Sequence, residues 1–277
     1  MYKLVFLVLV VVILHGMVYA DPITLYMRDR TAISEWTPPK SHSKLPIPEP
    51  EGDFVLEYKT VTWEGKETAI IVCDVWNTMC NKIAADRVAE LAPHINDVVT
   101  AAREKGVLII HAPSGTMEFY KDTPQRLRCQ NAPAIPTEVP LQWNKLNPEV
   151  EPPLPIDDSD NGWEGPNTEG PPPQSRQHPA IEIAPEDAIG DGKDVYYLLK
   201  QQGIKNVILM GVHTNMCILG RPFGIRQLTY LGMNVRGVNG LAPLLEAQLA
   251  ADGRFLQGRI HAFRQQRPQG PVRDAAQ

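Results

Sequence analysis

Three short and almost entirely apolar runs restrict the fold of this chain more than any other feature of its sequence. They span residues 68–74, 107–111 and 206–211. Continuous apolar runs of this length are typical of parallel strands that are buried on both faces of a sheet. Such a sheet needs a covering layer on each side, and the segments between the runs should supply it.

The segments that follow these runs have the features of helices. Apolar residues recur at helical spacing over residues 84–105, and residues 194–202 and 218–230 also have helix-forming sequences. Residues 180–183 are a further short strand candidate. This alternation predicts an α/β fold with an open, mostly parallel sheet and helices on both faces, a Rossmann-like arrangement of three layers.

Residues 1–20 have the features of a secretory signal peptide. Lys3 precedes an apolar run over residues 4–14, and small residues up to Ala20 provide a cleavage site. An uncleaved membrane anchor is the alternative, but this run is shorter than the roughly 20 residues needed to span a bilayer. We therefore expect a secreted or periplasmic protein with no stable membrane span after cleavage.

Proline content divides the rest of the chain. Residues 21–65 are rich in proline and are expected to form an arm or linker before a single domain over residues 66–240. Within that domain, residues 113–179 lack periodicity, so this long insertion is either a lid or substrate loop or a flexible surface segment. Residues 241–277 are an irregular tail in which residues 244–251 are a short helix candidate.

Charge and cysteine content narrow the possible partners. The net charge is −5 and the Lys and Arg residues are scattered, which argues against nucleic-acid binding. The four cysteines are too few for a disulfide scaffold, and none forms the CxxC pair that binds zinc; they are Cys73, Cys80, Cys129 and Cys217. We expect a small-molecule substrate and no metal or cofactor, and leave open whether the chain forms a homo-oligomer.

Polar residues stand where the predicted strands end. These are Asp74, His111 and the loop over residues 211–217, and ligands of open α/β sheets bind outside the carboxyl ends of the strands. Cys217 lies where this loop should enter a helix, a position that stabilises a thiolate and offers backbone N–H groups to an oxyanion. The alternative for Cys217 is a small buried core residue, as many free cysteines are.

Two motifs around these residues resemble a known family. GVHTNMC, which ends at Cys217, resembles the G-x-x-T-x-x-C segment of the isochorismatase-like (cysteine hydrolase) superfamily, which includes nicotinamidases and other amidohydrolases. IIVCDVWN resembles the first strand of that family, which ends in a catalytic aspartate, here Asp74. The resemblance covers residues 68–232 without the long insertion, and it implies an isochorismatase-like hydrolase domain.

The resemblance also implies roles for particular residues. Cys217 would attack an amide carbonyl, while Asp74 would take the thiol proton and later activate water. The family has a cis peptide just before its cysteine loop, a place occupied here by Val212 and His213. The backbone N–H groups of His213 and Cys217 would then form the oxyanion hole.

The third member of the family triad, a lysine, has no clear equivalent in this chain. The family lysine stands at the end of the strand before the helix that precedes the cysteine strand, and residues 180–183 contain none. Lys193 is the nearest lysine downstream and is our nominee, while Arg176 and His178 precede the strand and could approach from the insertion. Without a nearby cation, Asp74 and a Cys217 thiolate would repel each other.

Several further residues are candidates for substrate contact. Trp76 would either stack on a planar substrate or pack in the core, and Asn77 and His111 complete the predicted substrate or oxyanion set. Arg221 and Arg226 follow the cysteine motif; they would favour an anionic substrate if they face the site, or are ordinary surface or ion-paired arginines.

The sequence thus favours an exported cysteine hydrolase that acts on a small-molecule amide or related C–N bond. The alternative is a catalytically impaired pseudoenzyme or small-ligand binding module on the same fold, because the family lysine is missing. A third reading is a structural extracellular module in which Cys217 forms a disulfide.

Overall fold

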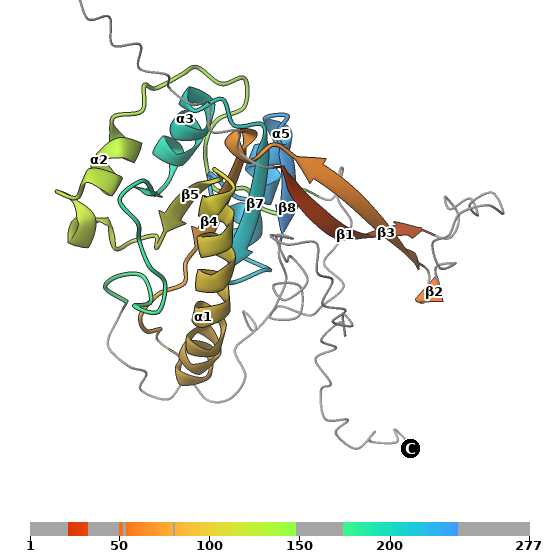
Figure 1. Cartoon of the computed structure of the whole chain (residues 1–277), viewed down its shortest axis with the longest axis horizontal. Coiled ribbons are helices and arrows are strands. Elements are labelled where there is room, and N and C mark those ends of the chain that lie inside the picture. The colour runs from red at the N-terminus through yellow and green to blue at the C-terminus, as the bar shows by residue number, and fades with distance from the viewer. Residues whose placement is uncertain (1–21, 33–49, 52–53, 80, 148–173, 238–277) are drawn as a thin grey trace, which may run out of the picture.

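The computed structural model describes residues 22–32, 50–51, 54–79, 81–147 and 174–237 (Figure 1). The predicted signal peptide lies outside the described residues. The same is true of residues 148–173 of the long insertion, and of the C-terminal tail with its helix candidate at residues 244–251.

A five-stranded parallel sheet forms the centre of the molecule, with strand order β6-β5-β4-β7-β8 (Figure 1). All four pairings are parallel. The strands are β4 (Thr68–Cys73), β5 (Leu108–Ala112), β6 (Ala188–Ile189), β7 (Asn206–Gly211) and β8 (Asn234–Gly237). The three strands that were predicted most clearly are β4, β5 and β7, and they occupy the middle of the sheet.

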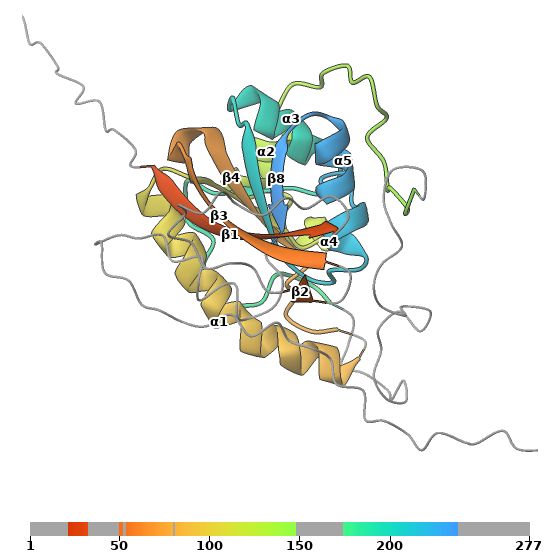
Figure 2. The same cartoon turned by 90° about the vertical axis from the view of Figure 1, so that its right-hand side faces the viewer.

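Helix α1 (Lys82–Glu104) covers one face of the sheet. It begins at Asn81, whose side chain accepts a hydrogen bond from the Ala84 backbone N–H. Its buried stripe, Val88, Ala92, Ile95, Val99 and Ala102, belongs to one cluster with Ile70, Val72, Ile109, Ile208 and Met210 of the strands. Figure 2 shows α1 on one side of the sheet and the remaining helices on the other.

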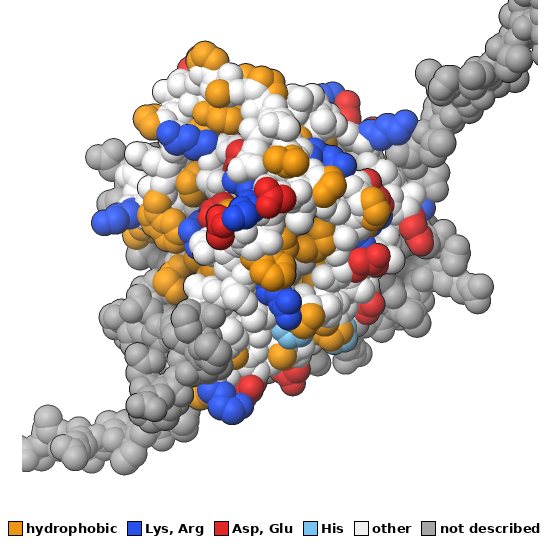
Figure 3. All heavy atoms as spheres, turned by 90° about the vertical axis from the view of Figure 1, so that its left-hand side faces the viewer, with side chains coloured by type: hydrophobic (Ala, Val, Ile, Leu, Met, Phe, Trp, Pro, Cys, Tyr) orange, Lys and Arg blue, Asp and Glu red, His pale blue; other side chains and the backbone are white. Residues whose placement is uncertain are grey.

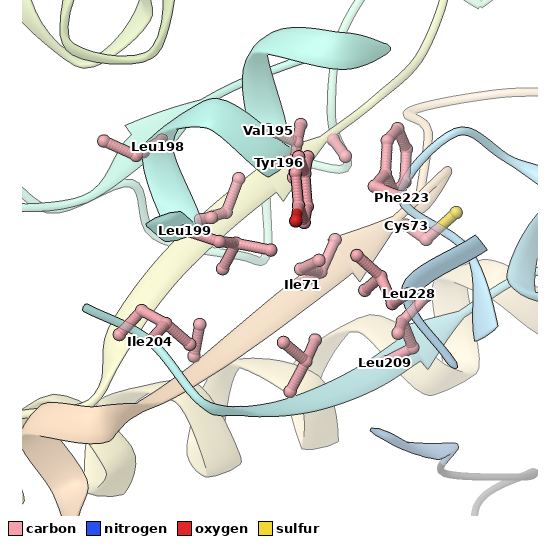
Figure 4. Packing of buried hydrophobic residues seen from close by; sticks show 14 of the residues in the cluster. Ile71, Cys73, Val195, Tyr196, Leu198, Leu199, Ile204, Leu209, Phe223 and Leu228 are labelled. Carbon is pink, nitrogen blue, oxygen red and sulfur yellow. The ribbon is translucent and has the colours of Figure 1, made fainter. Parts of the chain in front are cut away.

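The opposite face is covered by α2 (Pro124–Gln130), α3 (Lys193–Gln201), α4 (Cys217–Gly220) and α5 (Ile225–Tyr230). Ile71 of β4 and Leu209 of β7 point into this layer, where they pack with Leu199 of α3 and Leu228 of α5 (Figure 4). Alternate strand residues therefore feed two separate cores. This is the predicted α/β fold with helices on both faces.

The segment that was expected to form an arm contains two paired strands. β1 (Ile23–Ala32) and β3 (Phe54–Trp63) run antiparallel in a register from Ile23↔Trp63 to Ala32↔Phe54, and β2 (Pro50–Glu51) adds to β3. Ile23 and Leu25 are buried in the α1-side core. Prolines dominate only residues 38–50, and the aromatic and β-branched residues of β3 are the strand signal that this composition obscured.

The strand before α3 lies later in the chain than expected. Residues 180–183 form no strand, because the backbone N–H of Ile181 bonds the His178 carbonyl and that of Glu182 bonds the Asn96 side chain. The strand at this place is β6, which has only two residues, Ala188 and Ile189. A strand of this length leaves almost no pattern in the sequence.

Several other elements differ from the sequence-based expectation. The helix expected over residues 218–230 is divided into α4 and α5, because the chain turns at Pro222 and Gly224. β8 was not expected. Within the insertion, η2 (Met117–Tyr120) and α2 are regular, and Thr123 caps α2 by accepting the Arg126 N–H. A further 3-10 turn, η1 (Gly65–Glu67), precedes β4.

The described surface is mixed in character. On the face shown in Figure 3, acidic and basic side chains are interspersed with one another and with hydrophobic ones. None of the helices in the described part of the chain is both long enough and apolar enough to span a bilayer.

Candidate active site

The carboxyl ends of β4 and β7 bring Asp74 and the 211–217 loop together. Asp74 directly follows β4 and has a left-handed φ of 54°. Gly211 ends β7 with a φ of 128°, and a Cβ there would lie 1.9 Å from the Cys73 carbonyl oxygen. Only glycine lets the two strand ends approach this closely, so the sequence Gly211-Val212-His213 leaves the sheet directly beside Asp74.

The carboxylate of Asp74 is fully buried and held from two sides. Its Oδ1 accepts the Ser114 backbone N–H at 2.9 Å, from the loop after β5. Its Oδ2 accepts Arg221 Nε at 3.2 Å and Nη2 at 2.9 Å. A buried carboxylate is costly without such partners, and the guanidinium supplies the compensating charge.

Cys217 is a free thiol at the first residue of α4 and is 8% exposed. Burial and then the charge and hydrogen bond of Asp74 raise the pKa of Cys217 to about 12, while Arg221 and the His213 backbone act in the lowering direction. The thiol is therefore protonated at neutral pH, and a base must remove its proton before the sulfur can act as a nucleophile. Because Cys217 is unpaired, the disulfide-linked reading of this residue is wrong.

A second thiol, Cys73, also neighbours Asp74. Burial, Asp74 and Cys217 all raise the pKa of Cys73 well above its ordinary value. Cys73 is fully buried, and in Figure 4 its side chain lies in the core beside Phe223. Of the two thiols next to this carboxylate, Cys217 is therefore the more accessible.

Arg221 is the basic side chain that the structure places at Asp74. Burial, the largest single effect, works against its charged form, but the charge and hydrogen bond of Asp74 together with the charges of Cys217 and Cys73 raise the Arg221 pKa. Its guanidinium also lies over the Trp143 ring, with Cζ 5.4 Å from the ring centroid. Arg221 follows Cys217 by four residues, about one helical turn, and this spacing is the sequence signal that could have identified it.

The other basic candidates lie elsewhere. Lys193 is the exposed first residue of α3. Arg176 stacks its guanidinium on Phe119 at 5.5 Å, and the His178 backbone N–H bonds the Val75 carbonyl. Among the described residues, only Arg221 makes a salt bridge with Asp74.

The end of β6 has no room for the lysine that the resemblance implies. Gly190 follows this strand, and a Cβ there would lie 2.6 Å from both Cys129 Sγ and Val195 Cγ2. Any side chain at this position would collide with the core. The cation that contacts Asp74 is therefore Arg221, which follows the helix that begins at Cys217.

His213 occupies the predicted position beside Cys217. The Val212–His213 peptide bond is cis, as the resemblance implies. The His213 carbonyl accepts the N–H groups of Met216 at 3.1 Å and Ile218 at 3.2 Å, which shapes the loop that carries Cys217. Burial lowers the His213 pKa against the opposing effect of Asp74, so its imidazole is neutral at pH 7.

The structure does not bring His111 to the site. Its side chain is fully buried, with Nδ1 2.9 Å from Gln177 Oε1 and Nε2 2.8 Å from Asp187 Oδ2. Both ring nitrogens are thus bonded within the protein, and this geometry leaves neither for the predicted substrate contact.

Trp76 and Asn77 support the site from behind. Trp76 is 8% exposed, packs in the α1-side core, and donates its indole N–H to the Ser114 carbonyl at 3.1 Å. Asn77 Oδ1 accepts the backbone N–H groups of Ser175 and Arg176. Trp76 thereby fixes the turn whose N–H holds Asp74, while Asn77 fastens the end of the insertion.

The described residues contain no group of three or more His, Cys, Asp or Glu side chains placed to hold a metal ion. Among the described residues, the groups at this sheet edge are the Asp74 carboxylate, the Arg221 guanidinium, the His213 imidazole and the thiols of Cys217 and the more deeply buried Cys73, together with backbone N–H groups of the loop over residues 211–217.

Comparisons with known proteins give matches among solved structures. No protein-family model and no curated protein sequence matches the chain. The structure is similar to a cysteine hydrolase from Pseudomonas syringae pv. phaseolicola 1448A, with a TM-score of 0.38 and 18% identity over 64% of this chain and 73% of that one. It is also similar to an isochorismatase family protein from Burkholderia thailandensis, with a TM-score of 0.34 and 16% identity over 62% and 77% of the two chains.

Proposed function

We propose that this chain is an exported cysteine hydrolase that cleaves a small-molecule amide or related C–N bond. Cys217 is the nucleophile, Asp74 is the general base, and Arg221 supplies the cation. The observation that carries the proposal is that one buried carboxylate, Asp74, interacts both with the Cys217 thiol and with the Arg221 guanidinium. A nucleophile, its base and a charge partner are thereby combined at one edge of the sheet.

The reaction proceeds in two halves. Asp74 takes the proton of the Cys217 thiol as the sulfur attacks the carbonyl carbon. The C–N bond then breaks, the nitrogen leaves with the proton from Asp74, and the acyl group remains on sulfur as a thioester. Asp74 next takes a proton from water, whose oxygen attacks the thioester, and the returning proton restores the Cys217 thiol as the acid is released.

Arg221 offsets the negative charge that Asp74 and Cys217 exchange during the reaction. When the proton moves from Cys217 to Asp74, the negative charge moves from the carboxylate to the sulfur. Arg221 interacts with both groups. Asp74 and Cys217 each raise the Arg221 pKa, and Arg221 opposes the rise in the Cys217 pKa. A cation that remains in place throughout avoids the repulsion between a thiolate and a carboxylate.

The carbonyl oxygen needs donors as it gains negative charge. The proposed donors are the backbone N–H groups of His213 and Cys217, which belong to the loop that leaves β7. Backbone donors of this kind do not have to reorganise during the reaction, so they stabilise the oxyanion efficiently.

The test is ammonia or amine release from a panel of small amides by wild-type protein and by Cys217→Ala. We expect the variant to lose turnover completely, while Cys129→Ala, which changes a buried thiol outside the site, retains it. Mass spectrometry of the working enzyme should also detect an acyl adduct on the Cys217 peptide. Full turnover by a reduced and folded Cys217→Ala protein would show that the nucleophile is wrongly assigned.

A specific observation favours a second candidate, a binding module without catalysis. Burial and then the charge and hydrogen bond of Asp74 raise the pKa of Cys217 to about 12, which keeps the thiol protonated at neutral pH. In this case iodoacetamide would alkylate Cys217 no faster than a free thiol at neutral pH, and no amide of the panel would be cleaved.

Export is part of the proposal and has its own test. We expect the protein recovered from the periplasm or medium of an expressing cell to begin at Asp21, as measured by intact mass. Recovery of the full-length chain in a membrane fraction would instead support an uncleaved anchor.

A further inference from the structure

One segment of the long insertion lies directly against the helix that begins with Cys217. In this segment, residues 141–147, the Asn144 backbone N–H donates to the Gly220 carbonyl at 2.8 Å. The Trp143 ring lies on the same residue, because a Cβ on Gly220 would stand 2.8 Å from Trp143 Cε2. Gly220 thus permits an indole ring to rest on the backbone of α4, one residue before Arg221.

The 141–147 segment is fixed in this position by a buried amide. Gln227 of α5 is fully buried, and its Oε1 accepts Asn144 Nδ2 at 2.7 Å and the Gln142 backbone N–H at 3.2 Å. Arg226 Nη1 donates to the Asn144 carbonyl at 3.3 Å. Side-chain bonds to the backbone of a loop replace the hydrogen bonds that a regular element would make, and they hold this loop in one place.

The Arg221 side chain lies between this segment and Asp74. On one side its Nε and Nη2 donate to Asp74 Oδ2, and on the other its Cζ faces the Trp143 ring at 5.4 Å. Arginine has many rotamers, and a stacked aromatic ring favours those that keep the guanidinium flat against it. Arg221 is thus in contact on one side with the carboxylate of the site and on the other with a ring from the insertion.

We propose that Trp143 is a positioning residue of this site: its ring holds the Arg221 guanidinium on Asp74, and Gln227 holds the segment that carries Trp143. This inference deepens the proposed function, since it concerns the cation of the same site. It also assigns the 141–147 part of the insertion to the site itself, as a fixed wall.

The chain contains a matched control for this contact. Phe119 receives the Arg176 guanidinium at 5.5 Å, nearly the same distance as in the Arg221–Trp143 pair. Both rings are exposed, Phe119 by 55% and Trp143 by 44%. Phe119→Ala therefore removes an equivalent exposed ring and cation contact without altering Asp74, Cys217 or Arg221.

The experiment measures the rate at which iodoacetamide alkylates Cys217 in the full chain, followed on the Cys217 peptide by mass spectrometry from about pH 7 to about pH 10. It requires no substrate. In Trp143→Ala the guanidinium is no longer held beside the thiol, so a smaller fraction of Cys217 is ionised and we expect the rate at each pH to fall about threefold or more. Trp143→Phe should restore most of the rate, and Phe119→Ala should match wild type.

Trp143→Leu covers the case in which the alanine variant folds poorly. Leucine retains apolar contact with Gly220 but has no aromatic face, so the same decrease is expected. Cys129 is fully buried and its alkylation reports unfolding in every variant.

Each outcome decides between the proposals. Wild-type rates in folded Trp143→Ala or Trp143→Leu, together with slow alkylation in Arg221→Met, would overturn the role of Trp143 and leave the proposed function intact. Wild-type rates in Arg221→Met would overturn the role of Arg221 as the cation, and with it the reason for Trp143 to act.

Discussion

Two buried aspartates, Asp74 and Asp187, each form a salt bridge with an arginine, yet only one of them stands beside a thiol. Asp187 Oδ1 and Oδ2 both accept hydrogen bonds from Arg103, and Oδ2 also accepts the Ala184 N–H and lies 2.8 Å from His111 Nε2. Asp74 accepts one backbone N–H and two donors from Arg221.

The two carboxylates differ in their neighbours and in the effect that each has on them. Asp187 is surrounded by donors, and the hydrogen bonds from His111 and Arg103 outweigh burial, so its pKa is lowered. Asp74 instead affects a neighbour, because it raises the pKa of the Cys217 thiol. The arginine of the Asp187 cluster is 10% exposed and that of the Asp74 cluster is 24% exposed. The Asp187 cluster is closed to further partners, whereas the Asp74 cluster includes a thiol and an arginine that is more exposed to solvent.

Asp74→Asn should have the largest effect of the changes that separate these clusters. The amide cannot take a proton from Cys217, so we expect turnover to fall about a thousandfold, within the range for loss of a general base. Amide hydrolysis measured under saturating substrate tests this. A variant that retains a tenth or more of wild-type turnover would remove Asp74 as the base.

Asp187→Asn should affect folding and spare catalysis. It leaves Arg103 partly unpaired in a buried setting, and we expect the free energy of unfolding to fall by about 3 kcal/mol. Urea denaturation measures this loss. Asp86→Asn is the matched control, since the Asp86 pair with Lys82 is exposed and should change stability by less than about 0.5 kcal/mol.

The two arginines should respond differently to replacement by lysine. Arg221→Lys retains a positive charge beside Asp74 but loses the planar, two-donor contact, so we expect turnover to fall about tenfold. Arg103→Lys loses the same geometry at Asp187 and should lower the unfolding free energy by about 1 kcal/mol with turnover unchanged. Similar turnover in the two variants would break the comparison.

The smallest effect concerns acid stability. Because the Asp187 pKa in the folded state lies below its ordinary value of 3.8, its stabilising contribution is present above that value and is lost as the pH falls through the folded pKa. Wild-type protein should therefore lose more stability than Asp187→Asn between about pH 5 and about pH 2. Urea unfolding across this range provides the measurement, and equal losses would exclude Asp187 as a contributor.

The sequence predicted the centre of the fold better than its edges. β4, β5 and β7 are continuous apolar runs, and burial on both faces leaves a strong signal in each of them. The two residues of β6 and the four of β8 are too short to produce such a signal. The hairpin of β1 and β3 depends on pairing across the proline-rich segment between them, which no local pattern reveals.

The sequence also placed Asp74 and Cys217 at one edge of the sheet, because both follow parallel strands. It did not identify Arg221 as the partner of Asp74, since these residues lie 147 positions apart in the chain. Lys193 was nominated because it is near the expected strand end in sequence, and that criterion says nothing about which side chain reaches a carboxylate. The catalytic roles of Cys217, Asp74 and Lys193 remain predictions.

The crowded turn at Gly190, after β6, also limits which substitutions this site can accept. Exchanging the arginine for a lysine at Gly190 would require smaller residues at Cys129 and Val195 in the same step, because each of them fills the space that a new side chain would need. A side chain introduced at Gly190 alone would collide with both, so we expect such a substitution to lower stability. A lysine at that turn therefore requires changes at Cys129 and Val195 as well as at Gly190 itself.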